Sequence, residues 1–416
     1  MNTPLVKIET DVNPDFLCYD WKISRKSRIL SRPVTENHQY KEHVLLSVTR
    51  QPLSASKTTQ SHGLSTIAND TPTTLYISEI KVYLVKQTNL SNVATFSGIY
   101  TLEEIQKGKI HVGDDAVPMF KTTSGTSSQT ANHTVNCQIS REKRAFFCTS
   151  KLTEEDYYQG KCSQDDPFSK ERIKEEIEKR LNHVGMVDYP FPYPNQGPAS
   201  LCGPAAFFYC LLKDRPDIYE KAAWALWKYG KVKIGKLNIK PSNACKHVDH
   251  LKASYSNISG LDWLTLASLR DSENNIGKYD EIEDRVAGIT LPSGLNSWFG
   301  KIGCEKVTDN TSLFFSGNVD KLIKLNTDYS NNNNIILFIS SNVIDGNQGA
   351  NNKDHWICLA GNVKVNNKYI TSNSSLEELV NFDFFTWGEI INFNYSLKLS
   401  ELLNRFYGGL AFMPIR

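Results

Sequence analysis

The stretch Asn195-Gln196-Gly197-Pro198-Ala199-Ser200-Leu201-Cys202-Gly203-Pro204 decides how the second half of the chain is interpreted. Pro204 stands where a first-turn proline is tolerated, and residues 205–212 are apolar on every side, so a buried helix is predicted to begin at Cys202. Unpaired N–H groups and the dipole at such a helix start favour a thiolate. Cys202 is therefore the cysteine that we expect to react.

Gln196 lies six positions before Cys202. We expect an amide on that approach to point its NH₂ group at the same spot as the backbone N–H of Cys202. Two converging donors of this kind form an oxyanion hole, in which each donor stabilises the transition state by about 2.7–4 kcal/mol. The alternative is a small buried cysteine that starts a helix, with Gln196 on the surface.

His355 begins a short apolar strand, residues 355–360, directly after a polar loop. A histidine at a strand end can reach a thiol at a helix N-terminus and act as its base. Proton exchange between the two side chains predicts a thiolate–imidazolium pair at neutral pH. The alternative is that His355 is a structural residue.

Taken together, Gln196, Gly197, Cys202 and the distant His355 resemble the papain-like cysteine peptidases. The Cys-Gly-Pro-Ala-Ala step is closer to the bacterial branch of that superfamily, which includes the peptidases that process double-glycine leaders. Thr386-Trp387-Gly388 looks like the end of the Asn-Ser-Trp-Gly turn of papain relatives, and residues 406–412 are similar to their closing Gly-containing strand. The resemblance covers about residues 190–416, and it implies a papain-like fold.

Two departures from that family concern the residue that orients the histidine and the control of activity. Phe385 stands where papain relatives carry the orienting Asn, and a phenyl ring cannot hydrogen-bond an imidazole. The leader peptidases use an aspartate for this role, so Asp383, on the same strand face as Phe385, becomes the candidate. An ordinary aspartate at a strand entrance is the alternative, and Asn381 and Glu389 are fallbacks. The family's long inhibitory helices are missing, which points to a separate inhibitor.

The chain has 416 residues, a length that predicts about two domains. We expect a mainly β accessory or docking domain over 1–165, a helical linker over 166–190, and a papain-like cysteine hydrolase domain over 191–416. In the last domain helices come first and an antiparallel-looking sheet follows, which is the α+β order.

Periodicity and turn residues set the expected elements. Strands are expected at 43–48, 74–85, 145–148, 335–339, 355–360, 382–387, 390–395 and 409–413; helices at 170–181, 205–212, 216–229 and 261–269; and loops at 122–134, 331–334 and 345–353.

Composition excludes several classes of protein. The 40% apolar and 22% charged residues argue against a disordered polymer and a membrane protein. A net charge of +2 gives no reason to expect nucleic acid or a membrane surface as partner. No apolar run approaches the length of a spanning helix, and the N-terminus lacks a secretory signal pattern.

The cysteines and histidines give no sign of a metal site. The nine cysteines contain no CxxC pair, and we expect most to be reduced and buried. The cluster Lys246-His247-Val248-Asp249-His250 lacks further ligands at the right spacing for zinc and is expected to be a solvated loop. No cofactor and no metal are expected.

The resemblance implies a cysteine protease that cleaves a protein substrate. The architecture further resembles bacterial effector toxins: cytoplasmic in the producing cell, delivered by specialised secretion through the N-terminal domain, and controlled by a cognate inhibitor or immunity protein. One alternative is a different reaction on the same residues, as in a deamidase, a transglutaminase-like enzyme or a cell-wall peptide amidase. The other, suggested by Phe385, is a catalytically dead binding protein.

Overall fold

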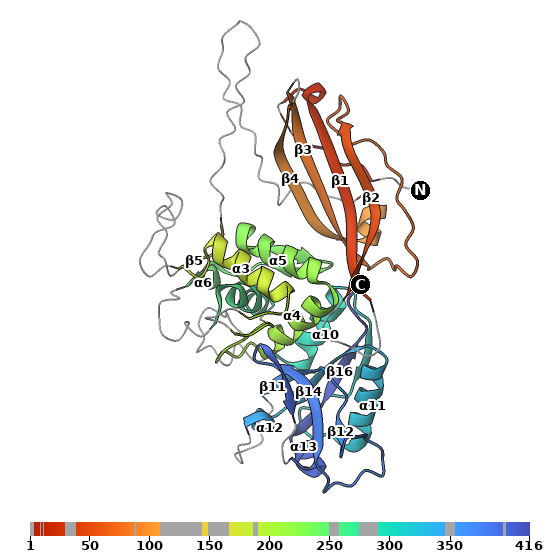
Figure 1. The fold of residues 1–416 in the computed structure, drawn as a ribbon, viewed down its shortest axis with the longest axis vertical. Helices are drawn as coiled ribbons and strands as arrows, with labels where there is room; N and C mark the ends of the chain where they lie inside the picture. Colours follow the sequence, from red (N-terminus) through yellow and green to blue (C-terminus); the bar gives the residue numbers. More distant parts are fainter. Residues whose placement is uncertain are drawn as a thin grey trace, which may run out of the picture. The chain divides into compact units, whose positions relative to one another are not determined.

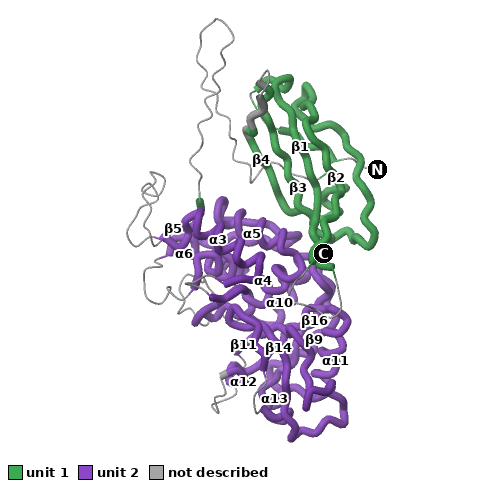
Figure 2. Tube along the Cα trace, in the orientation of Figure 1, with its two compact units in different colours: residues 1–144, 416 green, residues 145–415 purple. Residues whose placement is uncertain are grey.

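The computed structural model describes residues 4–8, 10, 12–29, 39–86, 89–108, 144–148, 166–185, 190–248, 258–273, 290–345, 354–393 and 397–416. The chain forms two compact units, residues 1–144 together with Arg416, and residues 145–415 (Figure 2). The boundary therefore lies at 144/145 rather than near 165. The expected loop at 122–134 lies outside the described residues, as does most of the one at 345–353.

The first unit is built on an antiparallel sheet of order β2-β1-β3-β4 (Figure 1). Its elements are η1 (Pro14–Phe16), β1 (Leu17–Arg28), β2 (Tyr40–Pro52), β3 (Leu75–Lys86), β4 (Asn89–Thr101) and α1 (Leu102–Gln106). Alternate residues of β1, among them Tyr19, Trp21 and Ile23, are buried in one hydrophobic cluster. Nε1 of Trp21 donates to Oγ of Ser78 at 2.9 Å, so the largest ring of this core is also hydrogen-bonded.

The second unit combines helices with a larger sheet. Its helices are α3 (Lys170–Leu181), α4 (Cys202–Asp214), α5 (Pro216–Tyr229), α6 (Asn243–Lys246), α7 (Gly260–Asp262), the π-helical turn η2 (Trp263–Ala267), α8 (Ser268–Ser272), α10 (Pro292–Lys301), α11 (Val319–Ser330), α12 (Asn342–Asp345) and α13 (Leu399–Arg405). Its strands are β5 (Phe147–Cys148), β6 (Val232–Ile234), β7 (Leu237–Ile239), β8 (His247–Val248), β9 (Lys306–Asp309), β10 (Asn334–Ile339), β11 (His355–Leu359), β12 (Lys364–Val365), β13 (Lys368–Tyr369), β14 (Val380–Thr386), β15 (Glu389–Phe393) and β16 (Phe406–Phe412).

The eight-stranded sheet has the order β13-β12-β14-β11-β10-β16-β9, and β15 pairs with β14. Its pairings are antiparallel, and β16, the last strand in sequence, lies between β10 and β9. The expected mixture of helix and sheet is thereby confirmed. Helix α3, expected to be a linker, belongs to the second unit because its apolar Ile173 and Ile177 are buried.

Helix α4 is buried along almost its whole length, as its all-apolar sequence predicts. It begins at Cys202, and α5 ends at Tyr229, directly before Gly230, whose φ of 63° is the left-handed conformation that favours glycine. α4 packs against β11 and β14. The sheet therefore receives the start of α4 beside the strand on which His355 lies.

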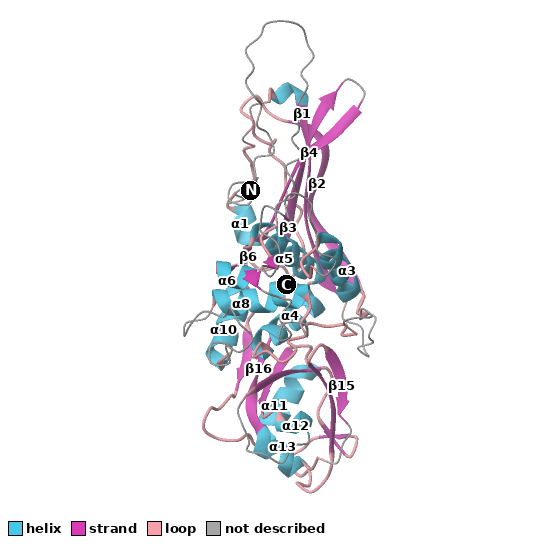
Figure 3. Cartoon of the chain, turned by 90° about the vertical axis from the view of Figure 1, so that its left-hand side faces the viewer, coloured by secondary structure: helices cyan, strands magenta, loops and turns pink. Residues whose placement is uncertain are grey.

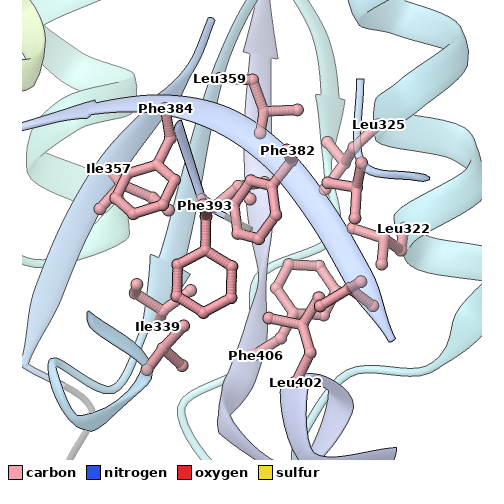
Figure 4. Close-up of a cluster of buried hydrophobic side chains, with 14 of the residues drawn as sticks. Leu322, Leu325, Ile339, Ile357, Leu359, Phe382, Phe384, Phe393, Leu402 and Phe406 are labelled. Carbon is pink, nitrogen blue, oxygen red and sulfur yellow. The ribbon is translucent and has the colours of Figure 1, made fainter. Parts of the chain in front are cut away.

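A second core lies among strands of this sheet, α11 and α13. Figure 4 shows Phe382 between Phe384 and Phe393 on one side and Leu322 and Leu325 of α11 on the other, and these residues belong to one buried hydrophobic cluster. In Figure 3 the strands curve around the region of α11 and α13. Among the described residues, no helix combines the length and the apolar character needed to cross a membrane.

Candidate active site

Cys202 is the first residue of α4, and it is 6% exposed. The preceding residue, Leu201, offers no side chain to cap the helix. The free N–H groups of the first turn are instead directed at the sulfur, because the backbone amides of Gly203 and of Cys202 itself donate to Sγ. The predicted placement of a thiol at a helix start is thus what the structure shows.

The sulfur lies beside β11 at the level of His355. Its S–H donates to the backbone carbonyl of Asp354 at 3.8 Å, and the backbone N–H of Trp356 donates to Sγ. In an extended strand these two groups flank the residue between them and point to the same edge. β14 pairs with β11 only further along, at Cys358 and Leu359, so the start of α4 adjoins the edge of β11 at His355.

The two residues predicted to react are therefore neighbours in space, although they are far apart in the chain. The contact that joins them runs through the backbone on either side of His355. Among the hydrogen bonds of the described residues, none connects Sγ of Cys202 with a ring nitrogen of His355.

The imidazole of His355 is held by two residues of the turn that ends β14. Its Nε2 is hydrogen-bonded to Oγ1 of Thr386 at 2.7 Å, and its ring lies 5.1 Å from that of Trp387, centroid to centroid. Thr386 is buried, and His355 is 4% exposed. A single hydroxyl and one aromatic face thus fix the ring orientation.

Asp383 does not take the role that we expected. Its Oδ1 accepts from Nδ2 of Asn392 at 2.6 Å, on the neighbouring strand. Phe385 lies on the same face of β14 as Asp383, and its ring stacks on that of Tyr209 of α4, with the centroids 4.1 Å apart. Because successive side chains of a strand alternate, the partner of His355 comes from the opposite face, and it is Thr386.

The two fallback residues lie away from His355 as well. Asn381 exchanges hydrogen bonds with Asn367 near the far end of β14. Glu389 is exposed at the start of β15, where it pairs across the hairpin with Thr386. The residue that sequence reasoning missed was signalled by the Trp-Gly pair, because Thr386 directly precedes it.

Gln196 is buried in the turn that leads to Cys202. Its Nε2 donates to the carbonyl of Ala199 at 2.9 Å, and the N–H of Ala199 donates back to the carbonyl of Gln196 at 3.1 Å. One amide hydrogen is therefore used within the turn itself. The NH₂ group has a second hydrogen, which is the one that the predicted oxyanion role would use.

Burial controls the protonation of both reactive side chains. It raises the pKa of Cys202 to about 11, against the opposing effect of the N–H donors of Trp356 and Gly203. It also lowers the pKa of His355 to about 4, against a weaker effect of Asp354. At neutral pH the site of this structure therefore holds a thiol and a neutral imidazole. The expected thiolate–imidazolium pair is not its resting state.

Two glycines allow the segments of the site to approach closely. A Cβ on Gly203 would lie 2.3 Å from Oγ1 of Thr290. A Cβ on Gly388, whose φ is +85°, would lie 2.7 Å from the Cβ atoms of Asn195 and Phe191. The turn that carries Thr386 is thereby packed against the segment that leads to Cys202.

A buried group of charged residues anchors the same segment from the other side. We call Glu176, Arg180, Ser259 and Asp262 the charged cluster. Nη2 of Arg180 donates to Oδ2 of Asp262 at 3.0 Å, and Oγ of Ser259 donates to the same oxygen at 3.1 Å. The N–H of Asn195 donates to the Asp262 carboxylate. The charged cluster therefore holds the residue next to Gln196.

Metal ligands do not gather anywhere in the described part of the chain: it contains no group of three or more His, Cys, Asp and Glu side chains that could bind an ion. His247 lies in β8, which pairs with β5, whereas Asp249 and His250 lie outside the described residues. The cysteines at 18, 148, 202, 210, 245, 304 and 358 are free thiols. Cys137 and Cys162 also lie outside the described residues.

The sequence and the structure were compared with known proteins in three ways. A scan against protein-family models, a search of curated proteins and a search of solved structures each found no match.

Proposed function

We propose that the second unit is a papain-like thiol hydrolase that cleaves peptide bonds of a protein substrate. The observation that supports this proposal best is the position of Cys202: a helix-start thiol at the edge of β11, between the backbone groups that flank His355. The hydrogen bond from His355 to Thr386 supports it further, because a positioned base needs a group that fixes its ring.

In the proposed reaction Nδ1 of His355 takes the proton of Cys202 as Sγ attacks the carbonyl carbon. Nδ1 accepts a proton only if Nε2 carries the ring hydrogen, and Nε2 then donates it to Oγ1 of Thr386. The N–H of Cys202 and the second amide hydrogen of Gln196 stabilise the oxyanion. His355 next protonates the leaving amine, and water, deprotonated by the same nitrogen, releases the acyl group and restores the thiol.

The neutral resting state makes proton transfer part of the attack rather than a step completed beforehand. Burial disfavours both charged forms, so the ion pair forms when substrate or solvent polarity stabilises it. Deamidation, transglutamination and cleavage of cell-wall peptides use the same steps with another acyl donor or acceptor, and they remain alternatives on the same residues.

A second candidate function is binding without catalysis, on the same fold. The burial of both side chains, at 6% and 4% exposure, favours it, since a closed thiol reacts slowly. Reaction with iodoacetamide at pH 7 separates the two candidates. The hydrolase requires Cys202 to be alkylated faster than the other thiols and His355→Ala to slow it; equal rates at all cysteines support the binding protein.

Proteolysis itself is tested by incubating the chain with a protein mixture and sequencing new N-termini. The wild type should generate them and Cys202→Ala should not, with a loss of about 10³-fold or more in rate. A mass gain of about one dalton on intact chains would instead indicate deamidation, in which an amide nitrogen is replaced by oxygen.

We further propose that the chain acts as a bacterial effector toxin, delivered by specialised secretion and restrained in its producer by a cognate inhibitor. This proposal rests on the resemblance and on the additional β unit. Expression of the wild type inside susceptible cells should halt their growth, whereas Cys202→Ala should be harmless. Equal harm by the two proteins, or harm by neither, excludes the toxin.

A further inference from the structure

The loop of residues 312–317, which we call the aromatic loop, exposes two adjacent phenylalanines. Phe314 is 83% exposed and Phe315 is 75% exposed, the two highest values among the large hydrophobic side chains of the described residues. Large apolar side chains that are exposed next to each other mark binding surfaces more often than single ones do. The aromatic loop is therefore a candidate binding surface.

The aromatic loop is held in place by hydrogen bonds. The N–H of Ser312 donates to the carbonyl of Tyr407 at 2.8 Å, and the N–H of Gly317 donates to that of Phe406 at 2.5 Å. Oγ of Ser312 accepts from the N–H groups of Phe314 and Phe315 at 3.3 and 2.9 Å. A preorganised loop loses less conformational entropy when it binds.

Strand register places the aromatic loop at the same end of the sheet as His355. Ile339 of β10 is paired with His355 on one side and with Phe406 of β16 on the other. The loop is bonded to Phe406 and Tyr407, so it follows β16 in the same row. Three steps between neighbouring strands, at about 4.8 Å each, put its backbone ~14 Å from His355.

Sγ of Cys202, at which the bond is cleaved, lies at the edge of β11 that faces away from β10. It is therefore one strand spacing further from the loop than His355 is, or ~19 Å in all. At about 3.3 Å per residue, ~19 Å corresponds to about six residues of an extended substrate chain. Residues 310–318 contain no charged side chain, so the loop has no means of attracting an anionic lipid headgroup or a charged partner. An apolar side chain of the substrate is the occupant that matches both the spacing and the chemistry.

We propose that Phe314 and Phe315 determine substrate specificity by binding an aromatic or large aliphatic side chain about six residues from the cleaved bond. This inference rests on the proposed peptidase function. It assigns to the substrate a chemical feature that the residues around Cys202 do not specify.

The test is digestion of a proteome-derived peptide library by the full chain, with the cleavage sites read by mass spectrometry. The wild type should select Phe, Tyr, Trp, Leu, Ile or Met about six residues from the bond. The double variant Phe314→Ser/Phe315→Ser should lose this selection. Its kcat/KM for a selected peptide should fall by about tenfold or more. A peptide too short to reach the loop should be cleaved at the wild-type rate.

Tyr369→Ser is the matched control, because Tyr369 is 65% exposed on β13, at the opposite edge of the sheet. It should leave the selection unchanged. Thermal unfolding at the wild-type temperature shows that the double variant is folded.

Four outcomes overturn the inference. Cleavage that depends on Cys202 but shows the same side-chain selection in the double variant overturns it and leaves the proposed function standing. A change from dimer to monomer in sedimentation, with cleavage unaltered, assigns the loop to a second copy of the chain. Loss of binding to phosphatidylcholine vesicles, again with cleavage unaltered, assigns it to lipid. A wild type that cleaves nothing rejects the function and the inference together.

Discussion

Two buried polar groups of the second unit hold the same segment of chain but differ in charge. The charged cluster has two carboxylates and a guanidinium, and it binds the backbone at Asn195. The candidate site, Cys202 with His355 and Thr386, is neutral at pH 7 and adjoins the segment through the Gly388 turn. The ion pair between Arg180 and Asp262 fixes the backbone, whereas a neutral thiol and imidazole keep their protons available for transfer. The charged cluster thus supports the segment, and the chemistry is proposed for the neutral pair.

The largest expected effect is the loss of Arg180. Arg180→Met leaves the Asp262 carboxylate buried without its cation, which should lower the free energy of unfolding by about 3–5 kcal/mol in urea denaturation. Arg180→Met/Asp262→Asn removes both charges and should recover part of that loss. A single variant with less than about 1 kcal/mol of destabilisation would show that the charged cluster is not the support that we describe.

Titration of His355 in the candidate site and of Glu176 in the charged cluster should change the free energy of unfolding in opposite directions as pH changes. The pKa of His355 is about 4 when folded and 6.5 when unfolded, so the unfolded chain alone takes up a proton as pH falls. The contribution of His355 to the free energy of unfolding should therefore drop by about 3 kcal/mol from pH 6.5 to 4. His355→Gln should remove that drop, as followed by denaturant unfolding at each pH.

Glu176→Gln is the contrasting variant for the pH series. Burial raises the pKa of Glu176 to about 7 from 4.5, so its contribution to stability falls as pH rises from 4.5 to 7. This variant should therefore flatten that second change and leave the effect of His355 in place. If His355→Gln follows the wild-type curve at every pH, the neutral buried imidazole is refuted.

A smaller effect is expected from the partner of the histidine. Thr386→Val leaves Nε2 of His355 without a hydrogen bond and should cost about 1–3 kcal/mol of stability. It should also slow alkylation of Cys202, because the ring is no longer held. Thr386→Ser keeps the hydroxyl and should behave like the wild type in calorimetry and in labelling. Equal behaviour of the Val and Ser variants would remove Thr386 from the site.

The smallest effect is expected at the residue that sequence reasoning favoured. Asp383→Asn keeps an oxygen for Asn392 and should change stability by no more than about 0.5 kcal/mol. The alkylation rate of Cys202 should also be unchanged, because Asp383 does not bond His355. A rate as low as that of Thr386→Val would restore Asp383 as the orienting residue.

The elements that the sequence predicts best are those with their own stop and start signals. Helix α5 runs from Pro216 to the residue before Gly230, and α3 covers the predicted range. In contrast, α11 was not predicted, although Val319, Leu322 and Leu325 recur at helical spacing. Polar residues around them masked the pattern. Strand β4 was also missed, because its Ser, Thr and Asn residues resemble those of a loop.

The sequence predicted the position of Cys202 well but not the hydrogen-bond partner of His355. Cys202 could be placed because a helix start is a local feature. Thr386 could not, since the face of β14 that meets His355 depends on Phe385 stacking against Tyr209, a contact between distant segments. The pKa values of Cys202 and His355 follow from burial, which single-sequence patterns do not determine.

The position of β16 between β10 and β9 has a consequence for biosynthesis. During translation α4 emerges long before residues 406–412, and β10 lacks its neighbour on that side until they leave the ribosome. A nascent chain therefore has its thiol but not the finished sheet that positions the base. If the chain is a hydrolase, its producer meets the competent enzyme only after synthesis has passed that strand.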